Sequence, residues 1–140
     1  MARPLVAAGA LFTDQAGRIL MVRPTYKEYW DIPGGYVEPG ESPHAACIRE
    51  VQEELSLTVQ VGPLLVVDWA PTEGEGDKIL YIFDAGSLTD KELKTVVFGD
   101  GEIAEARFVD PIEPGSSWCC RSSWPDLTGL LVLLCGRPGS

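Results

Sequence analysis

The segment GYVEPGESPHAACIREVQEELSL, from Gly35 to Leu57, carries most of the information about both the architecture and the chemistry of this chain of 140 residues. Its second half predicts an amphipathic helix that begins after Ser42, because a serine oxygen can accept from a first-turn N–H and the proline that follows needs no partner there. One side of this helix is apolar and is expected to pack on a sheet. The residues of that stripe are Ala45, Ile48, Val51 and Leu55.

The same helix carries three glutamates, Glu50, Glu53 and Glu54. A helix turns by about 100° per residue, so these positions lie on one face, where like charges repel by a few tenths of a kcal/mol per pair. Hard divalent cations such as Mg²⁺ or Mn²⁺ prefer carboxylate oxygen and would turn this repulsion into coordination. The alternative is a solvated acidic face, which is the commoner meaning of a charge run on a helix.

The whole segment resembles the signature of the Nudix hydrolases, G-x5-E-x7-R-E-U-x-E-E-x-G-U with U aliphatic, and this favours the metal site. The matching positions are Gly35, Glu41, Arg49, Glu50, Val51, Glu53, Glu54 and Leu57. The departure is Ser56, which stands where the family has a glycine that ends the helix in the left-handed conformation. A non-glycine residue adopts that conformation at a cost of roughly 1–2 kcal/mol. We expect Ser56 to alter the turn slightly and to leave the site in place.

The patterns along the chain predict a mixture of strands around this helix, which is typical of the α/β (α+β) class. The resemblance, which runs from about Val6 to about Pro111, sharpens this to an α/β/α sandwich with a mixed β-sheet and a Nudix domain over residues 1–113. Strands are expected at Leu5–Thr13, Arg18–Arg23, Thr58–Trp69, Lys78–Phe83 and Gly101–Val109, with a brief entry into the sheet at Trp30–Pro33 and a loop at Ala70–Asp77. Residues 114–140 are unusually apolar and either cover the core of the same domain, which we favour, or form a partner-binding surface.

The resemblance implies a Mg²⁺-dependent hydrolase, with Mn²⁺ as the other candidate ion, that cleaves a phosphoanhydride bond of a nucleoside diphosphate linked to another moiety. The substrate would be of the nucleoside triphosphate, ADP-ribose or dinucleotide type. Glu50, Glu53 and Glu54 would hold the metal, while Glu41 and Arg49 would support and orient them. Glu53 is the first choice for the general base, and Glu102 and Glu105 are the alternatives. The runner-up function is a Nudix-like nucleotide-binding or sensing domain without turnover, which would have no obvious need for all of these groups.

Candidate substrate contacts lie outside the helix. Gly34 and Gly35 would let the backbone come close to phosphate or metal, and Arg23 and Lys78 are candidate phosphate contacts because of their charge. Three aromatic residues could stack on a base, although aromatics at strand ends more often belong to the core or its rim: Trp30, Tyr36 and Trp69.

Composition narrows the partners to small molecules. A formal charge of −10 would repel nucleic acid polymers and anionic membranes, and the apolar run Leu5–Phe12 is too short to span a bilayer. The four cysteines have no metal-binding spacing and suggest reduced thiols in the cytoplasm. The only histidine, His44, is expected at the surface. A homodimer is what the resemblance suggests.

Overall fold

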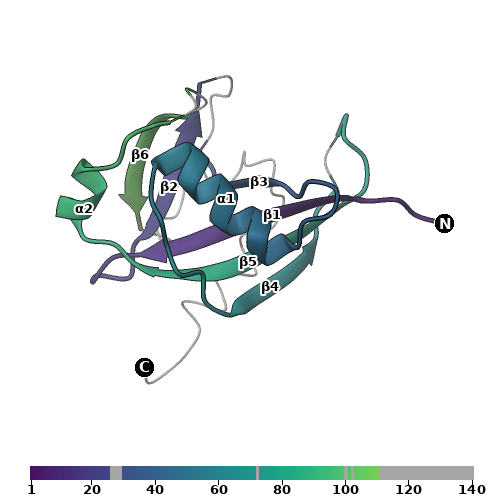
Figure 1. Ribbon diagram of the computed structural model, residues 1–140, viewed down its shortest axis with the longest axis horizontal. Helices are drawn as coiled ribbons and strands as arrows, with labels where there is room; N and C mark the ends of the chain where they lie inside the picture. Colours follow the sequence, from purple (N-terminus) through teal and green to yellow (C-terminus); the bar gives the residue numbers. More distant parts are fainter. Residues whose placement is uncertain (26–29, 72, 100, 102, 111–140) are drawn as a thin grey trace.

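The computed structural model describes residues 1–25, 30–71, 73–99, 101 and 103–110, and these form a six-stranded mixed sheet with a helix on one face (Figure 1). The elements are β1 (Leu5–Thr13), β2 (Ile19–Pro24), β3 (Gly34–Tyr36), α1 (Pro43–Leu55), β4 (Leu64–Trp69), β5 (Lys78–Ser87), α2 (Asp90–Lys94) and β6 (Ile103–Val109). The strand order is β4-β5-β1-β2-β6, and β3 pairs with β1. Only the β1–β5 pair is parallel among these strands. The expected class and mixed sheet are confirmed.

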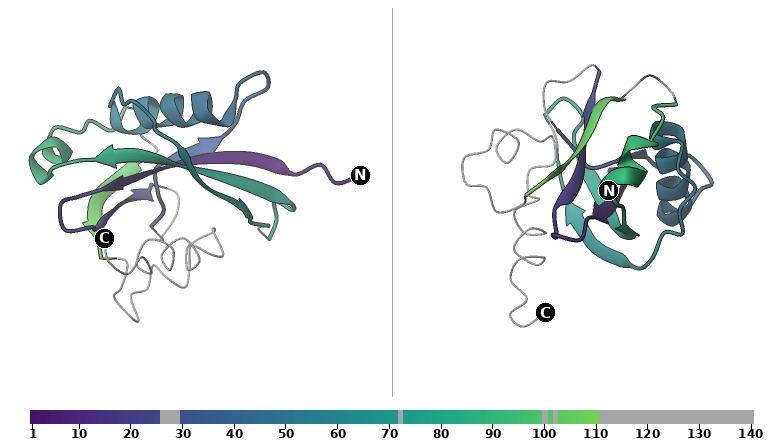
Figure 2. Two further views of the ribbon diagram at one scale, coloured as in Figure 1. Left: turned by 90° about the horizontal axis from the view of Figure 1, so that it is seen from below. Right: turned by 90° about the vertical axis from the view of Figure 1, so that its left-hand side faces the viewer.

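Alternation along β1 divides the core into two layers, because successive side chains of a strand point to opposite faces. Ala8, Ala10 and Phe12 belong to the cluster that packs against α1, whereas Ala7 and Leu11 belong to a second cluster on the other face. The edge-on views in Figure 2 show α1 lying along one side of the sheet. The small side chains of β1 let the helix approach the sheet closely.

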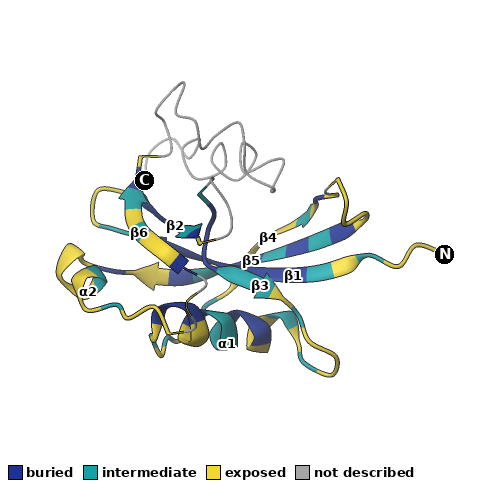
Figure 3. Ribbon diagram, turned by 90° about the horizontal axis from the view of Figure 1, so that it is seen from above, coloured by how far each residue is buried: buried dark blue, intermediate teal, exposed yellow. Residues whose placement is uncertain are grey.

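The buried side of α1 differs from the predicted stripe. The buried residues are Ala46, Cys47, Val51, Glu54 and Leu55, and Figure 3 shows the division of this helix into a covered and an exposed side. Ala45 is exposed and Ile48 is half-buried, so the prediction was wrong for Ala45. The reason is that α1 also contacts β3, where two glycines leave room for glutamate side chains that the pattern had placed on a solvent-facing side.

The bounds of three predicted strands need correction, and one short helix was missed. The strand expected from Thr58 begins only at Leu64, because Gly62 and Pro63 interrupt it and a proline cannot donate to a ladder. The brief entry into the sheet expected at Trp30–Pro33 is confirmed, because Asp31 forms one isolated bridge with Val22. β5 begins at Lys78 as expected but continues to Ser87. β6 ends at Val109 as expected but begins only at Ile103. The short helix α2, which begins with a capping box at Thr89, was not predicted.

The expectation about membranes can be compared with the described residues, whereas the expected domain boundary lies outside them. Within the described residues, no helix is long and apolar enough to cross a membrane. The boundary expected at residue 113 and the segment 114–140 lie outside the described residues, as do Cys119, Cys120 and Cys135. Cys47, the one described cysteine, is buried and is a free thiol, and its burial raises its pKa to about 12.

Candidate active site

Helix α1 begins and ends at the residues that the sequence indicated. The Ser42 hydroxyl oxygen accepts from the Ala45 N–H at 3.1 Å, and Pro43 occupies the first helical position. At the other end, Ser56 adopts the left-handed conformation, with φ 55° and ψ 33°, and its N–H donates to the Gln52 carbonyl at 2.9 Å. Among the described residues it is the only non-glycine residue with positive φ. Ser56 therefore ends the helix as a glycine would, at a backbone cost of about 1–2 kcal/mol.

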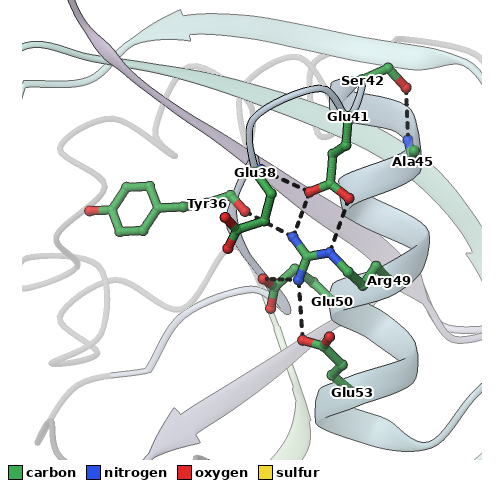
Figure 4. Close-up of polar contacts among 8 residues, drawn as sticks. All are labelled: Tyr36, Glu38, Glu41, Ser42, Ala45, Arg49, Glu50 and Glu53. Carbon is green, nitrogen blue, oxygen red and sulfur yellow. Dashed lines mark hydrogen bonds and ion pairs between the residues drawn. The ribbon is translucent and has the colours of Figure 1, made fainter.

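Arg49 is the centre of the polar cluster in Figure 4. Its guanidinium donates to both oxygens of Glu41, from Nε to Oε2 at 3.0 Å and from Nη2 to Oε1 at 2.6 Å. Nη1 donates to Glu50 at 2.9 Å and to Glu53 at 3.2 Å, and Nη2 also donates to the Tyr36 carbonyl at 3.1 Å. One planar donor thus fixes three carboxylates and ties the helix to the end of β3.

Glu41 is the anchor of this arrangement. The hydrogen bonds from Arg49, followed by the one from the Glu38 N–H at 2.9 Å, lower the pKa of Glu41 to about 2. The same carboxylate, followed by Glu50, raises the pKa of Arg49, although partial burial of the guanidinium opposes this. Both groups are therefore charged at any pH at which the protein is studied. The sequence indicated Arg49 and Glu41, but the contributions of the Tyr36 carbonyl and the Glu38 N–H have no sequence signal because they are backbone groups.

Glu50 and Glu54 lie between α1 and the glycines of β3. A Cβ on Gly35 would be 2.5 Å from the Glu50 carboxyl carbon, so a larger residue there would displace this carboxyl group from its observed position. Glu54 is buried, with 4% of its surface exposed, and one of its oxygens accepts from the Gly34 N–H at 3.3 Å. Gly34 is needed for a different reason, since its own Cβ would meet the Ala8 carbonyl oxygen of β1 at 2.2 Å.

The surroundings of Glu50 raise its pKa. Burial is the largest cause of its raised pKa, the Glu53 carboxylate adds to the rise, and Arg49 offsets only part of it. A side-chain hydrogen bond with Glu54 acts with Arg49 to lower the pKa of Glu50, but together they do not outweigh the effect of burial. Within the described part of the chain no three acidic, histidine or cysteine side chains already stand at metal-binding distances. The all-oxygen donor set of Glu50, Glu53 and Glu54 nevertheless suits Mg²⁺ or Mn²⁺.

The structure does not bring the two basic candidates to this cluster. Arg23 follows Met21 along β2 at the spacing that puts both on the face away from α1, and it pairs with Glu105 at 3.7 Å. Lys78 is buried on that same face, where Glu75 is 3.0 Å from its ammonium. Its ammonium lies 5.9 Å from the centre of the Tyr36 ring, and the Tyr36 hydroxyl bonds to the second oxygen of Glu75. The positive charge of Lys78 is thus already balanced by the carboxylate of Glu75.

The remaining candidates are placed as follows. Glu105, as the partner of Arg23, lies away from the carboxylates, and Glu102 lies outside the described residues. The Trp30 ring packs against the second core cluster and lies 4.4 Å from the Arg107 guanidinium carbon. His44 is exposed, as expected, although its Nε2 is 2.9 Å from the Val61 carbonyl oxygen. Trp69 is 53% exposed on β4.

Comparison with known protein families gives one match over most of the chain. The family model described as the NUDIX domain matches residues 3–118. A putative 8-oxo-dGTP diphosphatase of Bacillus subtilis (strain 168) is 29% identical over 105 residues, which are 74% of this chain and 65% of that protein. A methanol dehydrogenase activator of Bacillus methanolicus is 29% identical over 111 residues, 76% of this chain and 56% of that protein. The chain therefore spans less than two thirds of either relative.

Solved structures agree in architecture. A MutT protein from Methanosarcina mazei Go1 has 26% sequence identity and a TM-score of 0.66, with 79% of this chain and 80% of that chain covered. The E. coli ORF135 protein has a TM-score of 0.74 with 99% and 96% covered, and at 22% identity it supports the fold alone.

Proposed function

Because the chain belongs to the Nudix family, we propose that it is a divalent-metal-dependent hydrolase that cleaves a phosphoanhydride bond of a nucleoside diphosphate linked to another moiety. The observation that carries this proposal is the pair formed by the half-buried Glu50 and the buried Glu54, beside a glycine that could not be replaced without moving Glu50. A protein gains no stability from such a pair unless a cation accompanies it.

The proposed mechanism assigns separate tasks to the residues of the cluster. Glu50, Glu53 and Glu54 would hold Mg²⁺ or Mn²⁺, which when bound lowers the pKa of a water and neutralises phosphate charge. Glu53 is half-exposed, so its carboxylate can turn away from Arg49 and accept a proton from the attacking water. Arg49, held by Glu41, fixes the carboxylates in position. Gly34 and Gly35 lie beside these carboxylates, and the absence of side chains there would let the diphosphate come close to the backbone.

The competing function is a domain that binds a nucleotide without turnover. Such a domain needs no proton acceptor, whereas this chain keeps a half-exposed Glu53 next to the half-buried Glu50 and the buried Glu54. The intact set therefore supports the enzyme.

The substrate class is proposed from relatives. The name of the Bacillus subtilis relative, a putative 8-oxo-dGTP diphosphatase, places nucleoside triphosphates first, with release of pyrophosphate. A second relative has a name of another substrate class, so several classes of substrate must be tested. It is a human diphosphoinositol polyphosphate phosphohydrolase 2, which is 39% identical over 54 residues (38% of this chain and 30% of that protein). ADP-ribose and dinucleoside polyphosphates, cleaved within the diphosphate bridge, remain the second class.

The test is product release from nucleoside triphosphates, ADP-ribose, NADH and dinucleoside polyphosphates, measured with Mg²⁺, with Mn²⁺ and with a chelator. Turnover that stops with chelator and in Glu50→Gln supports the enzyme. Glu73→Gln, a change at an exposed loop glutamate, is the matched control and should keep full activity. Nucleotide binding without turnover would support the sensing domain instead.

Two further proposals follow from the same assignment. Arg23 and Lys78 would contact the substrate only where it extends to the face of the sheet away from α1, so Arg23→Ala should raise KM and leave kcat unchanged. A location in the cytoplasm, proposed from the cysteine pattern, is tested by fractionating cells that produce the protein.

A further inference from the structure

Tyr36, the last residue of β3, makes contacts on both faces of the sheet. Its carbonyl oxygen accepts from Arg49 Nη2 at 3.1 Å on the side of α1. Its side chain lies on the other side, because Tyr36 stands opposite Ala7, which belongs to the core cluster away from α1. Figure 4 shows the Tyr36 ring directed away from Arg49, while the carbonyl faces it. Tyr36 therefore connects the polar cluster around Arg49 to the far face of the sheet.

A buried lysine and a glutamate contact the Tyr36 side chain on that far face. Lys78 has 4% of its surface exposed, and an ammonium is costly to remove from water unless an opposite charge accompanies it. Oε2 of Glu75 lies 3.0 Å from the Lys78 ammonium, and the other oxygen of Glu75 accepts from the Tyr36 hydroxyl. The ammonium also lies 5.9 Å from the centre of the Tyr36 ring, within the range of a cation–π contact. The three side chains therefore form one continuous series of contacts.

The backbone around Glu75 sets the position of its carboxylate. Glu75 lies between Gly74 and Gly76, whose φ angles of 88° and 80° belong to the left-handed region that favours glycine. The next residue, Asp77, accepts from the Leu5 N–H of β1 at 2.9 Å through its carbonyl oxygen. The Glu75 carboxylate is therefore presented to Lys78 from a turn that is tied to the sheet.

We propose that Tyr36 and Glu75 are positioning residues for the hydrolysis proposed above, on which this inference rests. Lys78 and Glu75 hold the Tyr36 side chain on one face of the sheet, so that its carbonyl stays directed at Arg49 on the other face. The ladder between β3 and β1 ends at Tyr36, so the side chain adds a restraint where the ladder stops. Because the same guanidinium donates to three carboxylates, a change at Tyr36 reaches the groups proposed to hold the metal.

The test compares Tyr36→Phe and Glu75→Gln with the wild-type chain in the product-release assay. Phenylalanine keeps a ring that could stack on a base and removes only the hydroxyl, whereas glutamine keeps the size of the side chain and removes its charge. We expect each variant to lose about three- to tenfold in kcat, with KM changed by less than about twofold, which is typical of coupling through packed contacts. Because both changes act on the same contact, the double variant should lose little more than either one. Glu73→Gln, at an exposed glutamate of the same loop, is the matched control and should keep wild-type kcat and KM.

A spectroscopic measurement tests the same restraint without any turnover. In protein labelled with ¹⁵N-arginine, the Nε–H signal of Arg49 is identified by its loss in Arg49→Lys. It should exchange with water faster in both variants than in the wild type and in Glu73→Gln, while thermal melts show that all of these proteins are folded. Faster exchange in a chain that hydrolyses nothing would reject the proposed hydrolysis and support the restraint of Arg49. An unchanged Arg49 signal with wild-type kcat would overturn the proposal, and so would a rise in KM at constant kcat, which would show that Tyr36 and Glu75 act on the substrate itself.

Discussion

Gly35→Ala should lower the catalytic rate of this protein while leaving its stability nearly unchanged. Gly35 has no positive φ, so an alanine fits the backbone and lowers the entropy of the unfolded chain, which contributes about 0.4–1 kcal/mol in favour of folding. The new methyl group would, however, lie 2.5–2.7 Å from the three atoms of the Glu50 carboxyl group. Ordinary contact requires the flexible glutamate to move by about 1 Å. We expect the two effects on stability to offset each other within about 1 kcal/mol, a change of about 2–4 °C in Tm.

The effect on catalysis should be much larger. A shift of about 1 Å in a positioning group can cost about 100-fold in rate, so kcat should fall by roughly ten- to 100-fold, with weaker activation by Mg²⁺. The assay is the metal titration of product release, alongside a thermal melt. Gly62→Ala is the control, since its Cβ would meet the Asp84 carbonyl at 3.1 Å, far from Glu50, and any loss of stability there should leave kcat unchanged. A folded Gly35→Ala protein with wild-type kcat and metal dependence would refute the assignment of Glu50.

Three further predictions concern the base, the helix end and a turn. Glu53→Gln should fold normally and lose at least about 10²-fold in kcat; retained turnover would reject Glu53 as ligand and base. Ser56→Gly should raise the free energy of unfolding by about 1 kcal/mol, because Ser56 is left-handed; a chemical denaturation midpoint that falls would show that the serine side chain is needed. Burial opposes ionisation of Asp14, but the hydrogen bonds from the Arg18 N–H at 2.8 Å and guanidinium at 2.6 Å outweigh it and lower its pKa. The ionised form therefore stabilises the fold above the unfolded pKa of about 4, and the advantage of wild type over Asp14→Asn should disappear as the pH falls below that value; a stability difference between the two proteins that is independent of pH would contradict the ion pair.

Local patterns in the sequence were enough to predict the helix, most of the strands and the placing of three glutamates on the helix. The start of α1 depends on Ser42 and Pro43, which act through neighbouring backbone groups, and β1 was predicted with its observed bounds because alternation and the Asp14–Gly17 turn are local signals. The family resemblance likewise rested on a contiguous segment, and the family match over residues 3–118 confirms it. The strand expected from Thr58 was wrong in its first part because Gly62 and Pro63 interrupt it before Leu64.

The relation between the acidic residues was decided only by the tertiary structure. The helical period placed Glu50, Glu53 and Glu54 on one face opposite an apolar stripe, yet Glu54 is buried and Ala45 is exposed. This happens because β3 pairs with β1 and brings two glycines beneath the helix, which leave room for glutamate side chains. The sequence determined which groups are present and how they are spaced along the helix, since both are local properties. The pairing of strands distant in the chain determined which of these carboxyl groups is buried, because it decides what lies beneath the helix.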